Sequence, residues 1–191
     1  MSHSLESKTL SELHARGLRF DDYLATDPSR AEEWRNIHRR VALQEHQERL
    51  VAGFTRIMPV LVCSGIWCGD CVQQGPLLER IAAASARIDL RWLDRDEHPS
   101  FAESLRINGG DRVPVVVFMS EDFEPVSVLG DRTLTRYRAI AARNLGPSCP
   151  LPGAPVPDDE LEGTLQDWLD EFERVQLLLR VSPRLRQLHG D

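Results

Sequence analysis

Two cysteines three residues apart, Cys68 and Cys71, carry the clearest chemistry that this sequence offers. They follow an apolar run, Val60 to Val62, that breaks at Ser64, and they precede apolar residues that recur at helical spacing. This order predicts a buried strand that ends just before a helix, with both cysteines in the first helical turn. Residues at i and i+3 share one face of a helix, so we expect the two sulfur atoms to meet.

The start of a helix favours a thiolate at Cys68. Its free N–H groups and the positive end of its dipole stabilise negative charge. A lowered thiol pKa makes a cysteine nucleophilic near neutral pH, and the second thiol, Cys71, can then resolve a mixed disulfide. The pattern predicts thiol–disulfide exchange that needs no cofactor beyond the redox-active Cys68–Cys71 disulfide.

Composition narrows the class of protein. The chain has 191 residues, of which 41% are hydrophobic and 28% charged, which is ordinary for a globular protein. Its net charge of -7 argues against nucleic acid or an anionic membrane as a partner. No apolar run approaches a membrane span, and the first residues lack the pattern of a secretory signal. Four cysteines are too few for a disulfide scaffold, so we expect a cytoplasmic protein, where a Cys-x-x-Cys pair is redox-active or binds metal.

Residues 1–55 predict a helical N-terminal extension. A long helix is expected to begin at Asp27–Pro28, with Ser29 and Glu32 as a capping box, and to continue to Leu50. Three histidines of the extension are expected at the surface of the protein: His14, His38 and His46.

Residues 56–146 alternate between strand and helix patterns. Strands are expected at 58–63, 88–93, 113–119 and 126–129, and helices at 68–84, from 98 and at 132–144. This order predicts an α/β domain, with a mixed sheet of four to five strands and helices on both faces.

The last part of the chain divides at a group of prolines. Residues 147–157 predict a stiff linker, and residues 158–191 a C-terminal helical extension. Its amphipathic helix is expected to run from Asp158 or Asp159 to Val181 and to end at Pro183. Its apolar face either packs on its own domain or makes a homodimer, so both a monomer and a homodimer stay open.

Three features together resemble the thioredoxin superfamily over about residues 56–146. The stretch Trp67 to Cys71 reads Trp-Cys-Gly-Asp-Cys where the family has Trp-Cys-Gly-Pro-Cys. Val113–Pro114 stands at the place of the family's cis-proline, and Gly130 matches a glycine near the end of the last strand. The chain is most similar to a bacterial branch with a helical N-terminal extension and an Arg-Asp-Glu segment, here Arg95–Glu97. The resemblance implies a thioredoxin-like fold.

The resemblance also implies roles for individual residues. Cys68 would attack a disulfide of a protein or small molecule, and Cys71 would resolve the intermediate. Pro114 would lie beside the sulfurs, Val113 would pair with an extended substrate segment, and Trp67 would wall the site. Gly69 and Asp70 complete the motif. Taken alone, Pro114 is also compatible with an ordinary proline at the start of a strand.

The chain departs from the family at several charged positions. Asp70 replaces the proline between the cysteines, and a carboxylate disfavours a nearby thiolate, so we expect a reducing rather than an oxidising dithiol. The family buries an acid where this chain has Val62, and a lysine where it has Trp92. Asp70 is the nearest carboxylate and is a candidate base for Cys71; the simpler interpretation is a favourable residue in a first helical turn.

Three arginines lie near predicted strand ends. If they converge, they would form a basic rim that offsets Asp70 or selects anionic substrates; otherwise they are separate surface residues. The three are Arg95, Arg112 and Arg132.

Two other functions stay open. Cys63, Cys68 and Cys71 have the spacing of some iron–sulfur proteins, with Cys149 as a possible fourth ligand of a cluster or of zinc. Against this, Cys63 ends an apolar strand, as a small core residue would, so we expect no metal. The second alternative is a non-catalytic thioredoxin-like interaction module, which the missing buried acid favours and the intact cysteine pair opposes.

Overall fold

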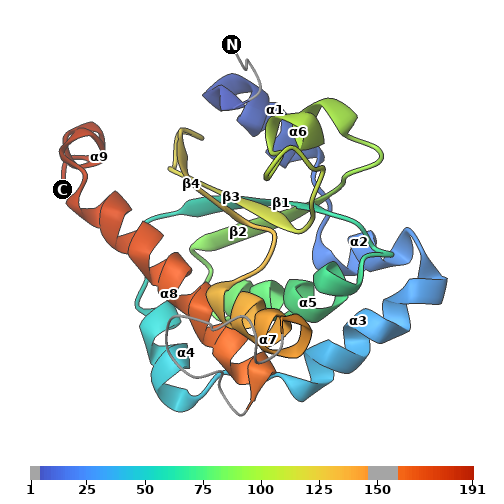
Figure 1. Cartoon of the computed structure of the whole chain (residues 1–191). Helices are drawn as coiled ribbons and strands as arrows, with labels where there is room; N and C mark the ends of the chain where they lie inside the picture. Colours follow the sequence, from blue (N-terminus) through green and yellow to red (C-terminus); the bar gives the residue numbers. More distant parts are fainter. Residues whose placement is uncertain (1–4, 146–158) are drawn as a thin grey trace.

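The computed structural model describes residues 5–145 and 159–191 (Figure 1). The predicted proline-rich linker and Cys149 lie outside these residues. In the described part, a four-stranded sheet has the order β2-β1-β3-β4. The strands are β1 (Met58–Ser64), β2 (Ile88–Asp94), β3 (Val115–Met119) and β4 (Pro125–Gly130). β1 is parallel to β2 and antiparallel to β3, and β3 is antiparallel to β4, as the alternating order and the hairpin pattern predict.

Helices cover both faces of this sheet. Figure 1 shows α1 (Ser7–Arg16) and α6 (Pro99–Ser104) on one side, with α5 (Gly69–Ala83), α7 (Leu134–Asn144) and α8 (Glu160–Val181) on the other. Every residue of the central strands β1 and β3 is therefore buried. Continuous apolar runs such as Val115 to Met119 are typical of strands covered on both faces.

The N-terminal extension packs on the sheet edge and on α5. Leu18 makes an isolated antiparallel bridge with Trp92, which adds one residue of pairing beyond the β2 edge. α3 (Pro28–Arg40) lies along α5, and the indole of Trp34 donates a hydrogen bond to the Ile66 carbonyl at 3.0 Å. An added Cβ at Gly75 of α5 would come within 2.1 Å of the Trp34 ring, so the helices approach closely because residue 75 is glycine.

The predicted long helix is wrong, because it is two helices. α3 ends at Arg40, Val41 is extended, and α4 begins at Glu45 and ends at Ala52. The side chain of Gln47 accepts a hydrogen bond from the Gln44 backbone, which starts the second helix. The N-cap of α3 also differs from the prediction. It is Asp27 rather than Ser29, and the Asp27 carboxylate accepts a hydrogen bond from the backbone N–H of Ser29.

The expectation for His14 is wrong as well. It is 5% exposed, its ring meets the edge of Phe123, and its Nε2 bonds to the Asp89 carbonyl at 2.8 Å. A buried histidine of this kind satisfies one ring nitrogen and packs the rest as an apolar group.

The C-terminal helix buries its apolar face on its own chain. Phe172 of α8 meets Phe118 of β3 with ring centroids 5.0 Å apart. α8 ends at Val181, before Pro183, as predicted. Pro183 also begins a further short helix, α9 (Pro183–His189), and Ser182 is the N-cap of this helix. Proline suits the first turn of a helix because its missing N–H is not needed there.

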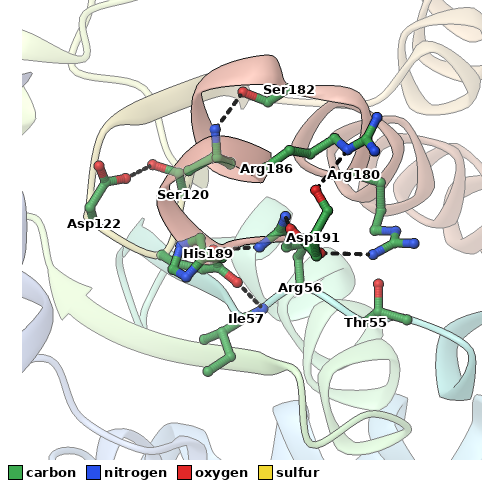
Figure 2. Close-up of polar contacts among 12 residues, drawn as sticks. Thr55, Arg56, Ile57, Ser120, Asp122, Arg180, Ser182, Arg186, His189 and Asp191 are labelled. Carbon is green, nitrogen blue, oxygen red and sulfur yellow. Dashed lines mark hydrogen bonds and ion pairs between the residues drawn. The ribbon is translucent and has the colours of Figure 1, made fainter.

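The end of the chain lies over the buried side chain of Arg56 (Figure 2). Arg56 contacts the carboxylates of Glu121 and Asp191, and Gln176 of α8 bonds to its backbone N–H at 2.8 Å and its carbonyl at 3.1 Å. His189 lies 2.6 Å from Glu121 in the same group. No helix within the described ranges is long and apolar enough to cross a membrane.

Candidate functional site

The two cysteines lie at the junction of β1 and α5. Cys68 is the N-cap of α5, its N–H donates to the Gly65 carbonyl at 2.9 Å, and its own carbonyl accepts from Val72 at 2.9 Å. Cys68 is partly exposed, whereas Cys71 is fully buried one turn later. Both are free thiols at the start of α5, and the Cys71 thiol acts on Cys68 as a hydrogen-bond donor.

The surroundings shift the pKa values of the two thiols in opposite directions. A hydrogen bond from the Cys71 thiol, together with backbone N–H groups of Cys71 and Asp70, lowers the pKa of Cys68 to about 6 against the opposing effect of burial. Burial, followed by the Cys68 thiolate, raises the pKa of Cys71 well above its ordinary value. Near neutral pH the exposed sulfur is therefore the thiolate and the buried one keeps its proton.

The Val113–Pro114 peptide bond is cis and lies beside this pair. The Cys68 sulfur is 3.7 Å from the Val113 carbonyl oxygen, and both Val113 and Pro114 are buried. The structure thus brings Val113 and Pro114 to the place that the resemblance implies.

Trp67 forms an exposed wall next to Cys68. The Arg95 guanidinium lies 4.6 Å from its ring centroid, and its indole N–H donates to Asp96 at 3.2 Å. An added Cβ at Gly65 would come within 2.9 Å of the indole, so the ring lies close over that loop. Gly69 has no atom within 4 Å of its Cβ position and faces open space.

Asp70 turns toward α7 and the loop before it. Its carboxylate binds Arg132 at 2.5 Å and Arg136 at 2.7 Å. Burial raises the pKa of Asp70, but the hydrogen bonds from the two arginines outweigh it and hold the pKa below the usual value. Two guanidinium groups therefore occupy the carboxylate, which favours the helix-start interpretation of Asp70 over a base for Cys71.

The basic rim forms only in part. Arg112 and Arg132 both bind the buried carboxylate of Asp131, at 3.1 and 3.2 Å. Arg95 does not contact Asp131; its guanidinium packs on Trp67 and donates to the Asp111 carbonyl at 3.0 Å. Arg112 and Arg132 thus share one carboxylate, whereas the acidic partner of Arg95 is Asp96.

A thioredoxin family model matches residues 17–141. The chain belongs to the thioredoxin family. The match begins inside the helical extension and covers both cysteines, Val113, Pro114 and Gly130. The predicted family and the predicted thioredoxin-like fold are thereby confirmed.

Two solved structures resemble this thioredoxin-family chain. A protein of unknown function from Pseudomonas aeruginosa superposes with a TM-score of 0.65 at 15% identity, over 86% of this chain and 95% of its own. An HIV epitope-scaffold superposes with a TM-score of 0.60 at 15% identity, over 95% and 98%. At this identity the likeness concerns the fold alone. No curated protein sequence matches the chain.

Four residues of this thioredoxin-family site escaped the sequence interpretation. Arg136 follows Arg132 by four residues, and because the sequence predicts a helix from residue 132, this spacing was an available signal for a shared partner. Asp131 was adjacent to a predicted site residue. Ser64 and Tyr23 gave no local signal, and Tyr23 reaches the site from a helix of the N-terminal extension.

The structure does not support metal binding by the closely spaced cysteines Cys63, Cys68 and Cys71. Cys63 is buried in β1, and burial raises its pKa to about 12, so it stays a thiol. Among residues 5–145 and 159–191, no three metal-binding side chains gather into a group that could hold an ion.

Proposed function

We propose that this protein is a thiol–disulfide oxidoreductase that reduces disulfide bonds through Cys68 and Cys71. The observation that supports it most directly is the difference in protonation between the two cysteines. Cys68 is a partly exposed thiolate at the start of α5, and the buried Cys71 thiol donates a hydrogen bond to it. A chain that used this domain only as a scaffold would not need two thiols with opposed pKa shifts.

The reaction follows from this difference in protonation. The Cys68 thiolate attacks one sulfur of a substrate disulfide, forms a mixed disulfide and releases the other substrate sulfur as a thiolate. Cys71 then loses its proton and attacks the Cys68 sulfur. The Cys68–Cys71 disulfide forms, the second substrate thiolate leaves, and two electrons have passed from the protein to the substrate. The Val113 carbonyl oxygen lies 3.7 Å from the Cys68 sulfur, and we assign the Val113 backbone as the place where an extended substrate segment pairs.

The pKa of Cys68 supports a reducing role. A value of about 6 lies nearer to the roughly 7 of thioredoxin than to the roughly 3.5 of a strong oxidant. Asp70 contributes little against the thiolate because two arginines offset its charge. A cytoplasmic location, where reductants would restore the dithiol, fits this proposal.

A chromogenic aryl disulfide tests the function, in a Cys149→Ser background that leaves buried Cys63 as the one thiol besides the pair. The wild-type pair should release about two aryl thiolates per chain, and Cys71→Ser about one while it stays trapped as the mixed disulfide. Cys68→Ser should release almost none. Cys63→Ala is the matched control and should behave as the wild type does.

The second candidate, a non-catalytic interaction module, makes the opposite prediction. If the wild-type chain releases no more aryl thiolate than Cys68→Ser, the oxidoreductase proposal is wrong. Size-exclusion chromatography with light scattering separately distinguishes the monomer from the homodimer, a question that the proposal leaves open.

A further inference from the structure

The ion pairs of Asp70 belong to a longer chain of charges that begins beside the reactive cysteine. In the described part of the protein, four arginines alternate with three carboxylates, and neighbouring members are 2.5–3.2 Å apart. This arginine–carboxylate chain runs from Arg112 through Asp131, Arg132, Asp70, Arg136 and Glu160 to Arg143. Because an arginine stands at each end, the chain carries one positive charge in excess.

The place of an arginine in this chain decides how many carboxylates it contacts. Arg132 and Arg136 are interior members, and each lies between two carboxylates. An arginine at an end contacts a single carboxylate among residues 5–145 and 159–191. At one end, Arg112 donates from Nη1 to Asp131 at 3.1 Å. Since a guanidinium presents several N–H donors in a planar fork, Arg112 keeps donors that can bind a second carboxylate.

Asp131 offsets only part of the Arg112 charge. One Asp131 oxygen accepts from both Arg112 and Arg132, and the other accepts from the Tyr137 hydroxyl. The Asp131 side chain is 4% exposed, whereas that of Arg112 is 42% exposed. A single negative charge shared by two guanidinium groups leaves the exposed one with positive charge toward solvent. Arg112 therefore offers a local cation on a protein whose net charge is -7.

Arg112 also lies next to the backbone that the proposed function assigns to the substrate. It directly precedes Val113 in the sequence, and the Val113 carbonyl oxygen is 3.7 Å from the Cys68 sulfur. The cis Val113–Pro114 bond follows. The cation is therefore one residue away from the point where an extended segment would meet the reactive sulfur.

Arg95, the other arginine beside the reactive turn, is more fully engaged. Its guanidinium packs on the Trp67 ring, pairs with Asp96 at 2.9 Å and donates to the Asp111 carbonyl at 3.0 Å. Its side chain is 25% exposed, less than that of Arg112. Of the two arginines, Arg112 is therefore the one with free donors and the greater exposure.

We propose that Arg112 makes this protein selective for disulfides flanked by carboxylates, namely Asp or Glu side chains beside the cysteine of an extended protein segment. The inference rests on the function proposed above and names the substrate class of the same site. Arg112 keeps Asp131 on one of its N–H groups and binds the substrate carboxylate with others. The electron transfer still passes through Cys68 and Cys71, so Arg112 decides which segment is bound and takes no part in the exchange.

Three peptide disulfides test this selectivity. The peptides have blocked ends and differ only in the residues on both sides of one cysteine, which are Asp, Asn or Lys. Each cysteine carries an uncharged thiopyridyl group whose release is followed by absorbance, with the protein in the Cys149→Ser background. At low salt, the Asp peptide should react about three- to fivefold faster than the Asn peptide, and the Lys peptide should be the slowest. Raising the salt concentration to about 0.5 M should reduce these differences.

Variants at the two ends of the arginine–carboxylate chain assign the effect to one residue. Arg112→Gln should bring the ratio of Asp-peptide to Asn-peptide rates close to one, and Arg112→Glu should reverse the preference. Arg143→Gln is the matched control, because Arg143 is the opposite end of the chain, is 57% exposed and contacts Glu160. It should keep the wild-type ratio.

Equal rates for the three peptides with the wild-type pair would overturn the proposal, and so would an unchanged ratio in Arg112→Gln. The peptide comparison and its salt dependence need no variant at residue 112, so they decide the question even if those variants fold poorly. Failure of the proposed function looks different, because the wild-type pair would then release the chromophore from every peptide no faster than Cys68→Ser does.

Discussion

The carboxylate of Asp70 binds the guanidinium of Arg136 at 2.7 Å and so joins the first turn of α5 to α7. Arg136 also reaches Glu160 of α8 at 2.7 Å, so the same side chain connects three helices. A negative charge one residue before Cys71 would by itself oppose a thiolate at Cys68. The pairing explains how this protein keeps both the carboxylate and a lowered thiol pKa.

This pairing predicts that Arg136→Gln raises the pKa of Cys68. Removing the guanidinium leaves more of the Asp70 charge facing the thiolate, and we expect a rise on the order of half a unit to one unit. The ultraviolet absorbance of the thiolate, followed against pH, measures it. Asp70→Asn should move the pKa in the opposite direction. Arg143→Gln is the matched control, because Arg143 binds Glu160 from an exposed position and does not contact Asp70.

The lowered pKa of Cys68 predicts a specific pH profile. Only the thiolate reacts with iodoacetamide, so the alkylation rate should rise as pH increases through about 6 and level off above it. Peptide mass spectrometry should find the label on Cys68, and on Cys63 and Cys71 only after unfolding. A midpoint near the ordinary value of 9.0, or early labelling of Cys71, would contradict the assignment of the two thiols.

The close approach of α3 and α5 predicts that Gly75→Ala is destabilising. Alanine ordinarily favours a helix over glycine, but here the new Cβ would meet the fully buried Trp34 ring at 2.1 Å. We expect a loss of about 1–3 kcal/mol in the free energy of unfolding, measured by urea denaturation. Gly69→Ala in the same helix has no neighbour within 4 Å and should leave stability unchanged or slightly increased. Equal stability of Gly75→Ala and wild type would refute the close packing of the extension on α5.

The buried position of Arg56 predicts a large effect from its removal. Its side chain is 5% exposed and contacts Asp191 (Figure 2) and Glu121, so Arg56→Ala would remove a buried cation from two carboxylates. We expect a loss of about 3 kcal/mol in the free energy of unfolding. Arg180→Ala, which removes a half-exposed partner of the same Asp191, should cost less than about 1 kcal/mol. Similar losses of unfolding free energy in the two variants would show that burial of Arg56 does not increase its contribution to stability.

Local patterns in the sequence determined the elements that carry the dithiol. A continuous apolar run predicted β1, helical periodicity predicted α5, and their junction predicted that Cys68 and Cys71 share a turn. These features depend on residues within one or two turns of each other, so they can be recognised without knowing the fold. The break between α3 and α4 and the new helix at Pro183 were missed, since caps and proline positions there admit more than one local outcome.

Tertiary structure alone decided the partners of the reactive turn. Asp70 meets Arg136 from a helix that begins beyond β4, and Tyr23 of the N-terminal extension reaches the neighbourhood of Cys71. Contacts of this kind depend on how whole helices pack, and a charge or a hydroxyl in the sequence does not specify its partner across such separations. The cysteine spacing therefore predicted a pair of thiols at the start of a helix, whereas packing determined which groups offset the Asp70 charge.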